Sequence, residues 1–195
     1  MVVTYPLVLL MSLVTAIIIV YGIETNSNED FTYFLLKLGL SFSLGISLLF
    51  ALKMLSQRLN SKWIWQIAGL FFLVIYYFIF PKKETNFNET YLFIIAPMFI
   101  LSHLLVAFVP FIKKENSEQS FWQYNKNLFV NLFLTAVFTG VLTGGIELAI
   151  LAIQELFSVD FDYKIYPEVF VLFAIFGSTF IFLLFNETGL DYLEK

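Results

Sequence analysis

Three ionisable side chains lie inside long apolar stretches of this sequence, and they are the first candidates for chemistry. They are Lys37, His103 and Glu147. A titratable group surrounded by hydrocarbon is costly, so such residues often belong to an ion path, a proton relay or a buried pair. We therefore take these three as the candidate intramembrane polar residues.

Lys37 and Glu147 are expected at the same depth. Each lies six residues from the outer end of its apolar stretch, which is ~9 Å at the rise of an α-helix. Equal depth permits an ion pair between the second and fifth stretches. Two alternatives stay open, since the long stem of Lys37 can reach the headgroups and Glu147 can be a protonated or water-exposed carboxyl near its helix end.

His103 is expected close to the membrane midplane and follows Pro97 in the same stretch. A proline inside a helix removes one backbone hydrogen bond and frees a carbonyl, here near Phe93. A histidine beside such an interruption can relay protons. The simpler interpretation is a hydrogen bond to a neighbouring helix, through Ser102 or the backbone.

The elements that must position these residues are membrane-spanning helices. The chain is 59% hydrophobic and 13% charged, whereas soluble domains are ~45–50% apolar and ~25% charged. Apolar runs of ~17–25 residues span the hydrocarbon core, and a backbone in lipid must satisfy its own hydrogen bonds as a helix. We predict an all-α polytopic transmembrane bundle forming one domain over 1–195. Its six spans are at about 6–23, 31–52, 63–80, 91–112, 128–153 and 166–185, the first being a retained span and not a signal peptide.

Small residues recur at a spacing of four in two of these stretches. The second stretch carries Gly39, Ser43 and Ser47, and the fifth carries Gly140 and Gly144. This spacing places them on one helix face, where they let two backbones approach closely. We expect them to pack helices within the chain; a homodimer face and a glycine-lined substrate path are the alternatives.

Basic residues in the loops predict the orientation, because cytoplasmic loops are enriched in Lys and Arg. With six spans both termini share one side. That side carries Lys53, Arg58, Lys62, Lys113, Lys114, Lys126 and Lys195, and the other carries Lys82, Lys83 and Lys164. We therefore expect both termini in the cytoplasm.

Several function classes are disfavoured by the composition. The chain has no cysteine and a net charge of −4, which excludes thiolate chemistry and disfavours nucleic acid as a partner. No phosphate loop, zinc signature or nucleophile elbow is present, so we expect no catalytic, cofactor-binding or metal-ligating residue. The leading hypothesis is a non-enzymatic packing or assembly module, in contact with lipid and with a membrane-protein partner or a second copy. The alternative is part of a transporter or permease for a small solute or ion, with Pro97 and the three polar residues lining its path.

Segments around the fifth stretch carry a family resemblance. They are Phe121–Lys126, Thr139–Leu142 and Leu156–Tyr166, together with Tyr5–Leu10 at the first stretch. In these segments the chain resembles the bacterial membrane family catalogued as domain of unknown function 4153. Members of that family are longer, so the resemblance implies the N-terminal part of such a protein, as a fragment or a short relative, in a bacterial inner membrane. Glu147 stands where the family would have a small apolar residue, and the resemblance implies no activity.

Overall fold

The described part of the chain is mostly helical and contains no strand. A computed structural model describes residues 4–25, 29–61, 63–81, 89–112 and 118–186. The elements are α1 (Pro6–Glu24), α2 (Glu29–Arg58), α3 (Ile64–Ile79), η2 (Glu89–Tyr91), α4 (Leu92–Phe108), η3 (Val109–Phe111), α5 (Glu118–Phe157), α6 (Ile165–Val171), the π-helical η4 (Leu172–Gly177) and α7 (Ser178–Phe185). The predicted all-α class is confirmed.

Five of these helices are long and apolar enough to cross a membrane. They are α1, α2, the run from α4 through η3, α5, and the run from α6 to α7, while α3 is an equally apolar helix of 16 residues. Large apolar side chains point outward from them, with Phe78 75% and Phe93 79% exposed. An apolar exterior of this extent belongs in lipid, so the chain is a membrane-spanning bundle.

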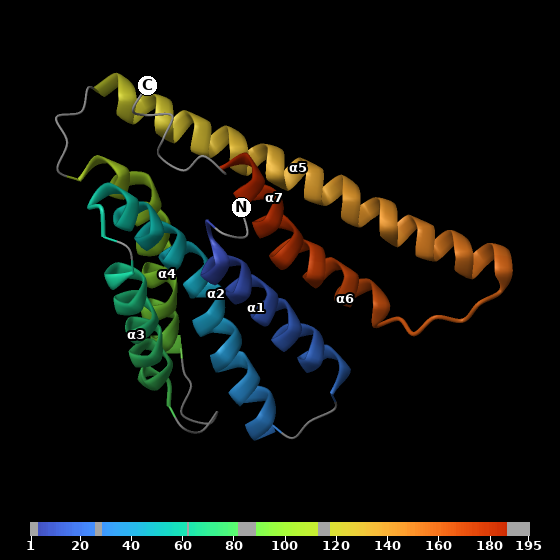
Figure 1. The fold of residues 1–195 in the computed structure, drawn as a ribbon. Helices are drawn as coiled ribbons and strands as arrows, with labels where there is room; N and C mark the ends of the chain where they lie inside the picture. The colour runs from blue at the N-terminus through green and yellow to red at the C-terminus, as the bar shows by residue number, and fades with distance from the viewer. Residues whose placement is uncertain (1–3, 26–28, 62, 82–88, 113–117, 187–195) are drawn as a thin grey trace.

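Helix α2 is the centre of the N-terminal half of the bundle, packed against α1, α3 and α4 (Figure 1). Glycines make these contacts close. A Cβ on Gly45 would lie 2.9 Å from Leu73 Cδ1 of α3 and 3.4 Å from Met11 Sδ of α1. On α3, a Cβ on Gly69 would overlap Leu52 and lie 3.0 Å from Leu49 Cδ2. Close packing of the helix backbones therefore stabilises the bundle, since lipid supplies no hydrophobic driving force for helix association.

Helix α5 forms the outer edge of the fold. It runs beside the continuous α6–η4–α7 segment, which lies between α5 and α1 (Figure 1). Contact with the N-terminal half is limited to the first turns of α5. There Tyr124 donates a hydrogen bond to the Val106 carbonyl at 3.0 Å, and the Tyr124 and Phe121 rings pack on Phe111.

The start of the fifth helix was predicted wrongly. We expected the span at 128 with Phe121–Lys126 before it, yet α5 begins at Glu118 and has 40 residues. Its first ten residues are too polar to resemble a membrane segment, so hydropathy placed the boundary late. The aromatic contacts on α4 stabilise these turns as helix outside the apolar stretch.

The sixth span contains an irregularity that the sequence analysis missed. Between α6 and α7 the backbone is π-helical over Leu172–Gly177. A π-helical segment leaves backbone carbonyls without their usual partners. The hydroxyl of Ser178 returns to the Ala174 carbonyl and that of Thr179 to the Ile175 carbonyl, the latter at 2.7 Å. These side chains satisfy backbone groups that water cannot reach in lipid.

Candidate functional site

Lys37 is held in the N-terminal third of α2, beside the C-terminal end of α3. Its ammonium lies 3.5 Å from the Pro81 carbonyl oxygen and ~5 Å from the centres of the Tyr33 and Tyr77 rings, at 5.1 and 5.0 Å. The side chain is only 9% exposed. Two ring faces and one carbonyl therefore stabilise the positive charge within this chain.

Glu147 lies far from this environment. It is half-buried on α5, and α5 packs on α6–η4–α7 and on α4. The predicted Lys37–Glu147 ion pair is not formed, because equal depth along two helices does not make the helices neighbours. Snorkelling of Lys37 toward the headgroups stays a prediction: its Nζ lies over two rings and reaches the carbonyl oxygen of Pro81, just beyond the end of α3.

A charge exchange tests this separation. We expect Lys37→Met to lower the free energy of unfolding by ~0.5–2 kcal/mol through loss of the two ring contacts, and Glu147→Gln to change it by less than about 0.5 kcal/mol. In Lys37→Glu/Glu147→Lys the costs of the single changes Lys37→Glu and Glu147→Lys should add within ~0.5 kcal/mol, as for distant sites. Unfolding in mixed micelles measures each variant, and recovery of stability in the double variant would show that the two residues do pair.

His103 belongs to a small polar network between α2 and α4. Ser102 donates to the Phe99 carbonyl at 2.8 Å, and Ser47 Oγ of α2 lies 2.7 Å from Ser102 Oγ. His103 Nδ1 also lies 2.8 Å from the Phe99 carbonyl oxygen. The simpler interpretation of His103, a hydrogen bond to a neighbouring helix, is wrong: its close contact is with the Phe99 carbonyl of its own helix α4, and Ser102 Oγ of the same helix is 3.5 Å from Nδ1.

Pro97 does not interrupt the fourth helix. Helix α4 runs from Leu92 to Phe108 with Pro97 inside it. The carbonyl four residues earlier, that of Phe93, loses its helical donor.

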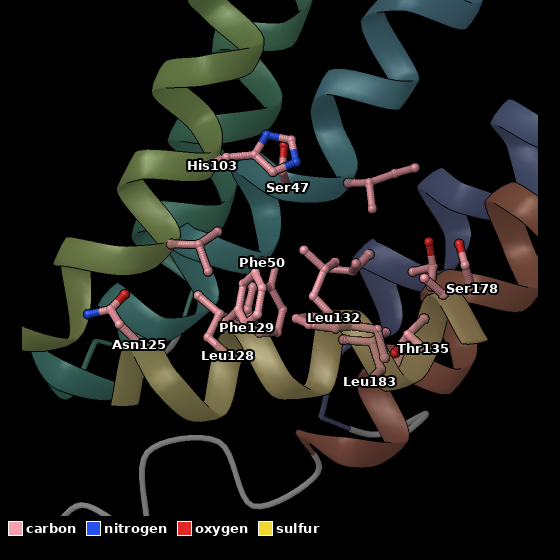
Figure 2. Close-up of a pocket in the computed structure, with 16 residues that line it drawn as sticks. Ser47, Phe50, His103, Asn125, Leu128, Phe129, Leu132, Thr135, Ser178 and Leu183 are labelled. Atoms are coloured by element: carbon pink, nitrogen blue, oxygen red, sulfur yellow. The ribbon is translucent and has the colours of Figure 1, made fainter. Parts of the chain in front are cut away.

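A cavity of about 510 Å³ opens between α5 and the helices of the N-terminal half. Its walls come from α1, α2, α4, α5 and α7, and its labelled side chains are shown in Figure 2. The polar residues on its walls are Ser47, His103, Asn125, Thr135, Ser178 and Thr179. The rest of the lining is apolar. This combination of volume, apolar walls and a few polar groups is that of small-molecule sites in general.

Sequence reasoning named two of these residues, His103 and Ser47, and missed the site. Thr135 is the most informative of those missed, since it is 3% exposed and its hydroxyl has no hydrogen-bond partner among the described residues. Thr135, Thr139 and Thr143 recur at a spacing of four in the sequence, but the lack of a partner for the Thr135 hydroxyl is a property of the tertiary structure.

Neither Lys37 nor Glu147 lines this cavity. The three candidate residues therefore lie in three places: Lys37 between α2 and α3, His103 in the cavity wall, and Glu147 further along α5. Over the described ranges, no three or more His, Asp or Glu side chains gather where they could hold a metal ion.

The two small-residue faces have different surroundings. A Cβ on Gly39 would meet Ile18 and Ile19 of α1 at 3.9 and 4.0 Å, and Ser47 bonds across to α4. Ser43 donates to the Leu40 carbonyl of its own helix. Packing within the chain is thus confirmed for the α2 face.

On α5 the same expectation is wrong. A Cβ on Gly140 or Gly144 would find no described atom within 4 Å, and the same holds for Gly145. The α6–η4–α7 segment packs on α5, and the buried residues of α5 in its membrane stretch are Thr135, Thr139 and Thr143. The glycine face of α5 is therefore available to something outside the described chain.

Comparison with known proteins gives no relative. No family model, curated protein or solved structure matches the chain. What can be said of function therefore rests on the residues and geometry above.

Proposed function

We propose that this chain is a non-enzymatic assembly module of the bacterial inner membrane that associates with a second copy of itself through α5. The observation that carries the proposal is the open space over Gly140 and Gly144. Glycines at this spacing in an apolar helix let two copies of the helix cross in close contact. Gly45 of α2 and Gly69 of α3 make such close contacts within the chain, whereas the glycines of α5 make none with described residues.

The geometry of α5 supports self-association. At ~100° per residue, Ala136, Gly140 and Gly144 fall within about 80° of one another on the helix surface. Glu147 lies on the same face, one turn beyond Gly144. A right-handed crossing centred on the glycines splays the two helices apart beyond the crossing point, so the two Glu147 carboxylates are not forced together.

Single cysteines test the association, because the chain has none of its own. In liposomes, Gly140→Cys and Gly144→Cys are expected to form intermolecular disulfides on mild oxidation. Val141→Cys is the matched control, since Val141 is 71% exposed and turned away by ~100°; it should stay reduced. Equal cross-linking at 140 and 141 would indicate random collision.

Substitution at the same position gives the strength of the association. Gly140→Leu is expected to weaken the dimer at least about tenfold, or ~1.4 kcal/mol, because its side chain separates the two backbones. Val141→Leu should leave the dimer unchanged. Analytical ultracentrifugation in density-matched detergent measures both, and a wild-type chain that stays monomeric at every protein-to-detergent ratio contradicts the proposal.

Transport remains the alternative from the sequence, yet its main support has weakened. A solute path should gather Lys37, His103 and Glu147 around one cavity. In the structure only His103 lines the cavity, while Lys37 is enclosed between α2 and α3.

Family and orientation are part of the same proposal. The resemblance to domain of unknown function 4153 supports a bacterial inner membrane, and the loop charges support both termini in the cytoplasm. Of those charges, Lys62, Lys82, Lys83, Lys113, Lys114 and Lys195 lie outside the described residues. Cysteine labelling from either side of the membrane tests the orientation.

A further inference from the structure

The cavity between α5 and the N-terminal half holds an unused hydrogen-bond acceptor. A carbonyl oxygen can only accept, so the 2.8 Å contact between His103 Nδ1 and the Phe99 carbonyl places the proton on Nδ1. In the neutral imidazole Nε2 then carries a lone pair. No described residue donates to Nε2, and His103 lines the cavity. The ring therefore presents an acceptor to whatever fills the space.

The hydroxyls on the cavity walls leave no unused partner for an occupant. Those of Ser47, Ser178 and Thr179 bond to described atoms. That of Thr135 has no hydrogen-bond partner among the described residues, but its oxygen has almost no accessible surface, so an occupant of the cavity does not reach it.

The remaining lining limits the charge and shape of the occupant. No Lys, Arg, Asp or Glu is among the residues that line this cavity. An ionised headgroup would lose its hydration there without compensation. The Phe50, Phe129 and Phe182 side chains on the walls favour an apolar or aromatic body.

We propose that this cavity binds an uncharged amphiphile whose hydroxyl donates a hydrogen bond to His103 Nε2 and whose body packs on the apolar walls. The site lies on the first half of the membrane stretch of α5, before the glycine face. Its walls include Ala136 of the association face but neither Gly140 nor Gly144, so a monomeric chain would retain the site.

A matched series of probes separates the hydroxyl from the apolar body. We choose 4-hexylphenol, which can donate, and 4-hexylanisole and hexylbenzene, which cannot. The chain has one histidine, so ¹⁵N-histidine labelling reports this ring alone, in wild-type protein in nanodiscs. We expect 4-hexylphenol to shift the Nε2 resonance in a saturable manner, and the two controls to leave it unchanged.

Affinity provides the second readout. By competition for the cavity, 4-hexylphenol should bind about three- to tenfold more tightly than 4-hexylanisole, the value of one neutral hydrogen bond. His103→Phe, which keeps an aromatic ring, should abolish that preference. Equal shifts or equal affinities for all three probes would mean that the cavity takes up any apolar molecule, as the bilayer does. No saturable shift for 4-hexylphenol would mean that there is no site. Either result overturns the proposal.

Discussion

Gly69→Leu is expected to lower the free energy of unfolding by about 1–3 kcal/mol, as overpacking of a close interface does. A side chain at Gly69 meets Leu52 at once and lies 3.0 Å from Leu49 Cδ2. Leu52 is partly buried and can turn aside, but Leu49 is fully buried and has no free space to enter. Helices α2 and α3 must then separate along their whole contact.

The matched control is Gly140→Leu on α5. It makes the same chemical change in a transmembrane helix, and both variants gain the same ~1 kcal/mol of intrinsic helix propensity. Because no described atom lies within 4 Å of a Cβ at Gly140, the monomer should be unharmed or slightly more stable. Unfolding in SDS mixed micelles, at protein concentrations where the chain is monomeric, compares the two. Equal effects at both glycines would contradict the packing described here.

The small-residue faces of α2 and α5 show a limit of prediction from the sequence. Both faces have the same spacing of four, so both are expected to pack helices within the chain. The α2 face contacts α1 and α4, whereas the glycines of α5 have no described atom within 4 Å. Which helices become neighbours depends on loop paths and on the sum of many weak contacts, and the residues of one helix do not contain that information.

The helical class of the chain could be predicted because lipid imposes it; five of the six predicted spans correspond to helices long enough to cross a membrane, and the third corresponds to a helix of 16 residues. Long apolar runs must be helical when no water can satisfy the backbone. Boundaries set by hydrophobicity were close for α1 and α3 but late for α5, where Tyr124 and Phe121 extend the helix by tertiary contact. The π-helical segment of the sixth span leaves no hydropathy signal, since Leu172–Gly177 is apolar in either geometry.

Only one part of the candidate site, His103, could be predicted as a candidate for chemistry from the sequence. His103 was conspicuous because an imidazole in an apolar stretch is costly. Its cavity draws on five helices, so no local pattern could reveal it. Lys37 is conspicuous in the sequence for the same reason, but it does not belong to the cavity. The cost of its charge in an apolar helix is offset by the Tyr33 and Tyr77 rings and by the Pro81 carbonyl.

Leu49→Ala is expected to cost about 1–3 kcal/mol of unfolding free energy, less than the 2–5 kcal/mol typical of soluble cores. In water such a substitution loses both the transfer of the side chain out of solvent and the packing around it. In a bilayer the separated helices are already in an apolar medium, so the transfer part vanishes and the cavity part remains. Leu49 lies at the α2–α3 contact with no exposed surface, so little of the cavity can close.

Leu148→Ala is the control for this reasoning. Leu148 is 67% exposed on α5, and lipid fills the space of the missing side chain, so its cost should stay below about 0.5 kcal/mol. The same mixed-micelle unfolding measures both variants. A cost at Leu49 of 4 kcal/mol or more would mean that its unfolded state is exposed to water, whereas equal small costs would mean that α2 and α3 are not in close contact. Only a difference of the expected size fits a bundle in which packing, and not exclusion from water, holds the helices together.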